Sequence, residues 1–153
     1  IFNISDANIK NSMKKMKLKG RLEEIKSGKL KNLIGENRLI IDGGHNINSA
    51  ISISNWVKQQ NEKVHLICGM MNDKPHKEFV NQFESSVNSI TLIDIPNQEE
   101  SISKEEFKKK LDNKNIFTAG SIEESLLMNN KDKNCIFLCA GSLYLAGEIL
   151  NLN

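Results

Sequence analysis

Short apolar runs alternate with longer segments of helical periodicity along most of the chain, and this alternation constrains the fold more than any other feature of the sequence. Such runs predict β-strands, and the segments between them are long enough to cross back over a sheet as helices. The expected strands are residues 38–43, 63–69, 89–95, 115–119 and 135–140. The expected helices are residues 46–60, 75–84, 103–111, 121–129 and 142–150.

Several expected strands are apolar at successive positions, as in Leu39-Ile40-Ile41. Because such runs are typical of parallel strands covered on both faces, we predict an α/β fold with a mostly parallel sheet between two helix layers. In the first helix we expect Trp56 to close the edge of an apolar stripe that faces the sheet. The expected members of that stripe are Ile47, Ala50, Ile51 and Val57. The expected helix N-caps are Asp73, Ser103 and Ser121.

Composition excludes some classes of partner. The 153 residues carry 21 Lys and Arg against 19 Asp and Glu, a net charge of +2, and 5% of them are aromatic. This balance does not indicate a nucleic acid or a membrane surface, and no apolar run approaches the roughly 18 residues that a membrane-spanning helix needs. The three cysteines form no C-x-x-C pair, so we expect buried free thiols in a reducing cytoplasm.

The beginning of the sequence suggests a fragment, because the chain starts with Ile1 and lacks an initial Met. We expect residues 1–19 to be the end of a preceding domain and a hinge, with a helix over residues 5–16 and the hinge over residues 17–20. Residues 20–153 are expected to form one domain.

The turn after the first expected strand carries an unusual set of residues, Asp42-Gly43-Gly44-His45-Asn46. In open α/β sheets, ligands bind beyond the carboxyl ends of the strands, where such turns gather. Two glycines let a ligand approach the backbone closely, Asp42 can accept hydrogen bonds from hydroxyl groups, and His45 can contact an anion or move a proton. The alternative is a tight structural turn in which Asn46 caps the helix.

The turn after the last strand, Gly141-Ser142-Leu143-Tyr144, again places a hydroxyl at a helix start. Ser142 and the helix N-terminal amides could hold a substrate carboxylate. Alternatively, Ser142 is only an N-cap and Tyr144 a core residue. The turn over residues 69–75 is interpreted as a capped structural turn, and His65 and His76 as structural or exposed histidines.

Two nucleotide-binding motifs are missing from the sequence. The first turn lacks the third glycine of the dinucleotide fingerprint, and no G-x-x-x-x-G-K-[ST] segment occurs. If the protein uses ATP, another domain must supply the P-loop. Arg21 could reach a phosphate across a domain interface, although an exposed arginine usually has no such role.

Four segments, in this order, are similar to the C-terminal domain of folylpolyglutamate synthase / dihydrofolate synthase, a member of the Mur ligase superfamily. The family patterns are G-R-[LF]-E, D-G-A-H-N, G-x-x-x-D-K and G-S-L-Y-L-x-G-E. The segments that resemble them are residues 20–23 (GRLE), 42–46 (DGGHN), 69–74 (GMMNDK) and 141–148 (GSLYLAGE). The chain departs from the family at Leu18, Gly44, Ile47 and Pro75, and residues 24–37 form a longer stretch than the family carries.

The resemblance implies a Rossmann-like three-layer sandwich and an ATP-dependent ligase that adds L-glutamate to dihydropteroate or folates through an acyl phosphate. It implies ATP and Mg²⁺ as cofactors, with the P-loop and most metal ligands on an N-terminal ATPase domain. Arg21 would contact the phosphates and Asp42 the ribose, while His45 would act catalytically beside the γ-phosphate or the glutamate. The implied substrate-binding residues are His45, Asn46, Ser142 and Tyr144. The fragment alone is expected to be inactive, and the protein a monomer.

Two other interpretations remain open at this point. The chain could belong to another Mur-type amino-acid ligase, such as one that acts on peptidoglycan precursors, which would keep the fold and change the acceptor. It could also be a stand-alone α/β module that binds a small anion or a regulatory partner without catalysis.

Overall fold

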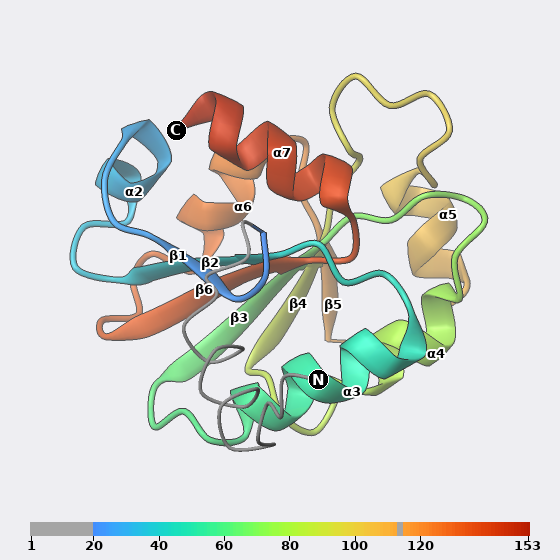
Figure 1. Cartoon of the computed structure of the whole chain (residues 1–153), viewed down its shortest axis with the longest axis horizontal. Helices are drawn as coiled ribbons and strands as arrows, with labels where there is room; N and C mark the ends of the chain where they lie inside the picture. The colour runs from blue at the N-terminus through green and yellow to red at the C-terminus, as the bar shows by residue number, and fades with distance from the viewer. Residues whose placement is uncertain (1–19, 113–114) are drawn as a thin grey trace, which may run out of the picture.

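The computed structural model describes residues 20–112 and 115–153, in which strands and helices alternate (Figure 1). The strands are β1 (Glu23–Ile25), β2 (Arg38–Asp42), β3 (Lys63–Cys68), β4 (Ser89–Leu92), β5 (Ile116–Thr118) and β6 (Cys135–Ala140). The helices are α2 (Lys29–Leu33), α3 (Ile47–Val57), α4 (His76–Asn81), α5 (Lys104–Lys109), α6 (Ile122–Met128) and α7 (Leu143–Leu152). The helix expected over residues 5–16 lies outside the described residues, as do positions 17–19 of the expected hinge.

The sheet brings the ends of three strands together. Its order is β1-β2-β6-β3-β4-β5, so the last strand of the chain lies between β2 and β3. These central strands are parallel, and both Asp42 and Cys68 are in register with Ala140 at the end of β6. The turns that follow β2, β6 and β3 therefore meet at one edge of the sheet. β2 is followed in the chain by β3, but β6 lies between them in the sheet. Such a change in strand order creates a topological switch point, where α/β proteins bind ligands.

Helices cover both faces of the sheet, which explains why its central strands carry apolar residues at successive positions. On one face, α3, α4 and α5 pack through side chains such as Ile53, Phe79 and Phe107. On the other, α2, α6 and α7 pack through Leu30, Leu126 and Ile149 and others. Figure 1 shows α2, α6 and α7 above the sheet and α3 and α4 below it. The predicted α/β sandwich with a mostly parallel sheet is confirmed.

The sequence does not predict β1 and α2. β1 has three residues and pairs antiparallel with β2, placing Glu23 opposite Ile41, and Ile25 is its buried residue. α2 has five residues, begins after Gly28 and buries Leu30. Because each of these elements buries one side chain, neither produces the repeated apolar spacing by which longer strands and helices are recognised.

The expected inner face of α3 is partly wrong. Ala50 and Val57 are buried as predicted and Trp56 packs against the core, but Ile47 and Ile51 are exposed. The buried stripe is Ala50, Ile53, Ser54 and Val57. That stripe follows the i, i+3, i+4, i+7 spacing of one helix face from Ala50, whereas the expected set began the same spacing at Ile47.

One of the three expected helix caps is also wrong. The side chains of Ser103 and Ser121 accept hydrogen bonds from the backbone N–H groups of Glu106 and Glu124, as expected for N-caps. Asp73 does not cap α4, whose N-cap is Pro75 without a side-chain hydrogen bond. Instead the Asp73 carboxylate accepts a hydrogen bond from Lys74 Nζ at 2.7 Å, so Asp73 pairs with Lys74 and does not cap the helix.

The three cysteines are free and buried, as predicted. Burial raises the pKa of Cys139 to about 12 and that of Cys135 to about 11. These thiols stay protonated near neutral pH and act as small apolar side chains of the core.

Acid is expected to destabilise the fold through His65, a buried histidine on β3. His65 Nδ1 lies 2.8 Å from Ser89 Oγ, and Nε2 lies 3.1 Å from Asp132 Oδ2. Burial lowers the pKa of His65 below its ordinary value of 6.5, although the neighbouring Asp132 raises it in part. Because the unfolded chain then binds a proton more readily than the folded one, the free energy of unfolding should fall as the pH drops from about 6.5 through the lowered folded pKa.

Urea unfolding between about pH 8 and pH 5 measures this dependence. The His65→Gln variant should show a shallower fall than the wild type. A residual slope is expected in the variant because burial also lowers the pKa of His76. Equal slopes in the two proteins would contradict the assignment to His65.

Candidate functional site

Asp42, the last residue of β2, organises the turn that follows it. Its side chain is 6% exposed. Oδ1 accepts a hydrogen bond from the Gly44 N–H at 2.7 Å, and Oδ2 accepts one from the Leu22 N–H at 2.9 Å. The carboxylate therefore joins two segments about twenty positions apart in the sequence.

Arg21 lies beside this carboxylate and faces solvent. Its Nη1 is 3.5 Å from Asp42 Oδ1, while its side chain remains 45% exposed. The segment is fixed by its backbone, because Gly43 N–H donates to the Gly20 carbonyl oxygen at 2.7 Å and Leu22 adopts a φ of 42°. A left-handed leucine is a strained conformation, and its N–H bond to Asp42 is part of what holds it. Arg21 is thus carried on a fixed backbone with a side chain that is able to move.

A third segment joins through the turn after β6. The Gly141 N–H donates to the Gly44 carbonyl oxygen at 3.0 Å. Ser142 follows as the N-cap of α7, and its hydroxyl accepts a hydrogen bond from the Tyr144 N–H at 3.1 Å. Ser142 is therefore an N-cap, which was one of its two expected roles. Its side chain also lines a hollow beside the start of α7.

His45 leaves one ring nitrogen available to a ligand. Its Nδ1 lies 3.0 Å from the Gly43 carbonyl oxygen, so this nitrogen carries the hydrogen that it donates. Among the described residues the structure gives Nε2 no hydrogen-bond partner. Asn46 is occupied as the N-cap of α3, where it and Ser49 exchange hydrogen bonds in a capping box.

Gly44 occupies a position with no room for a side chain. A Cβ there would lie 2.7 Å from Ser49 Cβ and 2.9 Å from Asp42 Oδ1. The alanine that the resembling family carries at this position would therefore push against the carboxylate that organises the turn. The glycine thus leaves room for the hydrogen bond between the Gly44 N–H and the Asp42 carboxylate.

A hollow of about 280 Å³ opens between these turns. The residues that line it are His45, Met71, Asp73, Lys74, Glu100, Ser142, Leu143 and Tyr144. Tyr144, which could have been a core residue, is 55% exposed at this wall. The Lys74 ammonium is paired with Asp73, and this hydrogen bond holds the pKa of the Asp73 carboxyl below its ordinary value.

The structure brings the predicted site residues together in two groups. His45, Ser142 and Tyr144 share the hollow. Arg21 and Asp42 lie together at the neighbouring turn, and Asn46 is committed to its helix cap. The sequence interpretation missed Lys74 and Glu100 as lining residues. Lys74 stands in a segment that resembles a family pattern and could have been found from it, whereas no sequence signal marks Glu100.

A larger hollow of about 470 Å³ lies at the opposite edge of the sheet, between the end of α2 and the loop before β6. Two of the side-chain amides that line it are engaged within the protein. Asn37 Nδ2 donates to the Asp132 carbonyl oxygen at 2.9 Å, and Asn130 Nδ2 donates to the Leu33 carbonyl oxygen at 2.9 Å. None of the predicted site residues lines this hollow.

Gly141 is expected to be the most sensitive glycine of the site. Its φ of 114° is unfavourable for any side chain, and a Cβ would lie 2.7 Å from the Gly69 carbonyl oxygen and 2.9 Å from Met70 Cγ. Gly141→Ala should therefore lower the free energy of unfolding by about 2 kcal/mol, as measured by urea unfolding.

Gly147 in α7 is the matched control, because a Cβ there meets nothing within 4 Å. Gly147→Ala should raise stability by about 0.5–1 kcal/mol, since alanine favours a helix interior. If both variants lowered the free energy of unfolding by the same amount, crowding and the left-handed backbone at Gly141 would not explain the loss.

The described residues hold neither a metal-ligand cluster nor a membrane-spanning helix. Residues 20–112 and 115–153 contain no group of three His, Cys, Asp or Glu side chains placed to hold a metal ion. In the same part of the chain, no helix is both long and apolar enough to span a bilayer.

Residues 20–143 match the family described as Mur ligase, glutamate ligase domain. A search of curated proteins found no match.

Solved structures share the fold. A bifunctional folylpolyglutamate synthase/dihydrofolate synthase from Yersinia pestis is 18% identical with a TM-score of 0.74, over 98% of this chain and 34% of its own. A Mycobacterium tuberculosis folylpolyglutamate synthase, complexed with ADP and AMPPCP, is 14% identical with a TM-score of 0.77, over 98% and 35%. A bifunctional enzyme with Mn, AMPPNP and L-glutamate bound is 17% identical with a TM-score of 0.71, over 98% and 35%. The chain thus spans about a third of the length of the structures it matches.

Proposed function

The chain belongs to the Mur ligase family, as its glutamate ligase domain, and on that premise we propose that it is the C-terminal part of an ATP-dependent ligase that joins L-glutamate to dihydropteroate or a folate. The observation that carries the proposal is the meeting of residues 20–22, 42–46 and 141–144 at one edge of the sheet through mutual hydrogen bonds. The folate specificity rests on the four sequence segments and on similar folds in synthases of that class.

The reaction needs an activated carboxylate. Transfer of the γ-phosphoryl group of ATP to the pterin carboxylate gives an acyl phosphate and ADP. The amine of L-glutamate then attacks the carbonyl carbon, phosphate leaves, the amine loses its proton, and an amide bond remains. Each step moves negative charge on phosphate oxygens, so catalysis depends on groups that neutralise this charge in place.

Arg21 and His45 suit this charge. The exposed guanidinium of Arg21 can leave Asp42 and contact phosphate oxygens in the bidentate way typical of arginine. His45 can direct Nε2 at the γ-phosphate or the incoming amine, because its Nδ1 is held by the Gly43 carbonyl oxygen. Asp42 is proposed to accept hydrogen bonds from the ribose hydroxyls of the nucleotide.

The hollow suits the amino-acid substrate. Lys74 supplies a cation on one wall, and the start of α7 supplies backbone N–H groups and a favourable helix dipole on the other. Both favour carboxylates, of which L-glutamate carries two. Ser142 and Tyr144 are proposed to contact the same substrate, and Asn46 contributes by fixing the turn that carries His45.

The P-loop is proposed to come from an N-terminal ATPase domain, since the sequence has none of its own. That domain is also expected to hold Mg²⁺, because the described residues offer no metal-ligand set. Closure of the two domains would exclude water from the acyl phosphate. We further propose that the protein is a cytoplasmic monomer and that the C-terminal part is inactive alone.

The decisive experiment measures ADP release by the full-length protein. We expect release to require both a pterin acid, dihydropteroate or a reduced folate, and L-glutamate, and the product to gain the mass of one glutamyl residue. Use of a UDP-sugar peptide in place of the pterin acid would assign the chain to another Mur-type ligase. Absence of ADP release with every acceptor would favour a binding module and overturn the proposal.

A further inference from the structure

The loop between β4 and α5 contributes Glu100 to the lining of the hollow. Two backbone hydrogen bonds attach this loop to the turn after β3. The Asn72 N–H donates to the Glu100 carbonyl oxygen at 2.9 Å and the Ile102 N–H to the Met70 carbonyl oxygen at 3.0 Å, and together they form an isolated antiparallel bridge between Met71 and Ser101. In Figure 1 the loop rises beside the first turn of α7. Glu100 is thereby held at the hollow by its backbone.

The lining of this hollow contains two carboxylates, and they differ in their partners. Asp73 is engaged by Lys74 at 2.7 Å. For Glu100, the part of the chain that the structure describes provides no hydrogen bond or ion pair to its carboxylate, although the residue lines the hollow. Glu100 is therefore the negative group of this wall that is available to a ligand.

We propose that Glu100 binds the ammonium group of the amino-acid substrate and so selects an α-amino acid over a plain dicarboxylate. This inference rests on the proposed function and adds a specificity-determining residue to it. Lys74 and the start of α7 favour carboxylates, but they would hold any dicarboxylic acid equally well. A carboxylate that accepts hydrogen bonds from the ammonium distinguishes L-glutamate from glutarate, because charge-assisted hydrogen bonds are the stronger kind.

Glu100 also orients the nucleophile. When Glu100 holds the ammonium while Lys74 and the start of α7 hold the carboxylates, the nitrogen is fixed inside the hollow that His45 also lines. The proposal concerns binding and orientation of the nitrogen before it loses its proton and attacks.

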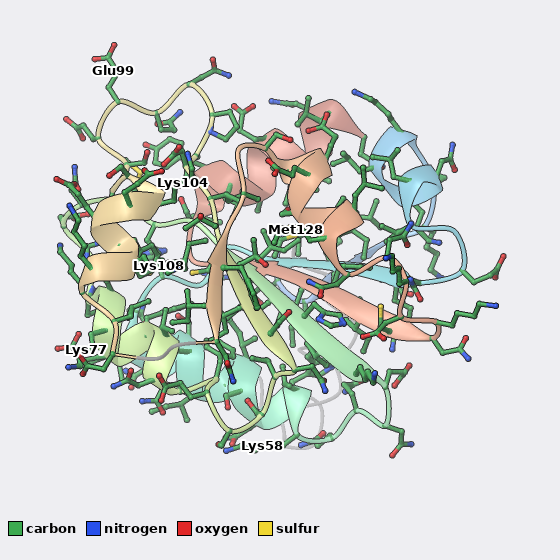
Figure 2. All side chains as sticks on the ribbon, turned by 180° about the vertical axis from the view of Figure 1, so that it is seen from behind. Lys58, Lys77, Glu99, Lys104, Lys108 and Met128 are labelled. Atoms are coloured by element: carbon green, nitrogen blue, oxygen red, sulfur yellow. The ribbon has the colours of Figure 1, made fainter. Side chains whose placement is uncertain are left out.

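The test compares Glu100→Gln with Glu99→Gln in the full-length protein. Figure 2 shows Glu99 at the tip of the same loop, pointing away from the body of the protein, which makes it the matched control. In Glu100→Gln we expect the KM for L-glutamate to rise about 10-fold or more, since a charged hydrogen-bond partner is lost. The KM for ATP should stay within about twofold, and Glu99→Gln should behave as wild type.

Glutarate provides the second measurement, because it has both carboxylates and no nitrogen. Its inhibition constant against L-glutamate should be unchanged in Glu100→Gln. An unchanged KM for L-glutamate, an equal effect of Glu99→Gln, or equal weakening of glutarate would each overturn the inference. If the wild-type protein shows no glutamate-dependent ADP release, it is instead the proposed function that fails.

Discussion

Arg21→Ala is expected to lower kcat/KM for ATP by about 100- to 1,000-fold in the full-length protein, the loss typical of a group that stabilises developing charge on a transferring phosphoryl group. The fold should hardly change. The side chain is 45% exposed, and its contact with Asp42 Oδ1 is long, at 3.5 Å. The backbone bonds that fix the segment use the Gly20 carbonyl oxygen and the Leu22 N–H, which the substitution leaves in place.

Arg38, the other arginine of the chain, is the matched control. It pairs with Glu24 and Glu62 at 3.1 Å, at the amino end of β2 and away from the candidate site. Arg38→Ala should leave the ATP kinetics within about twofold of wild type. Similar losses of kcat/KM in both variants, or a normal value in Arg21→Ala, would remove Arg21 from the phosphate site.

Asp42→Asn is expected to affect both stability and nucleotide selectivity. The substitution replaces a carboxylate oxygen with an amide NH₂ group that cannot accept from a backbone N–H. One of the bonds to Leu22 and Gly44 is then lost, which should lower the free energy of unfolding by about 2 kcal/mol. If the carboxylate also accepts from ribose hydroxyls, wild type should prefer ATP over 2′,3′-dideoxy-ATP by about 10-fold or more, and the variant should largely lose this preference.

Asp94 provides the control for the structural half of this effect. It follows β4 and accepts hydrogen bonds from Lys104 N and Nζ, each at 2.7 Å. Asp94→Asn should also cost stability but keep the wild-type preference between the two nucleotides. If Asp42→Asn lowers stability and retains the preference, Asp42 holds the turn together without contacting ribose.

The sequence predicted those parts of the fold in which every position is buried. β6 was predicted at its observed bounds, Cys135–Ala140, because the helix layers on both faces demand an apolar residue at each place. β1 could not be predicted, because a three-residue edge strand with one buried side chain leaves no pattern. The predicted inner face of α3 was partly wrong because Ile47 and Ile51 are apolar but exposed, so the spacing of apolar residues misplaced the buried face.

Part of the site could be predicted from the strand pattern alone. Asp42 ends β2, His45 and Ser142 stand in the turns after β2 and β6, and parallel strands place such residues at one edge whatever the strand order. Glu100 could not be found in this way, because its position depends on the pairing of two loops through Met71 and Ser101, far apart in the sequence. The hydrogen bond from the Leu22 N–H to the Asp42 carboxylate was also not predictable, since it joins two distant segments at a leucine with a left-handed backbone.

A crystal structure of the full-length protein with a non-hydrolysable ATP analogue and L-glutamate tests the account most directly. We predict the γ-phosphate within hydrogen-bond distance of Arg21, with the glutamate carboxylates in the hollow between Lys74 and the start of α7. A nucleotide bound at another edge of the sheet, with the turn over residues 42–46 facing bulk solvent, would contradict it.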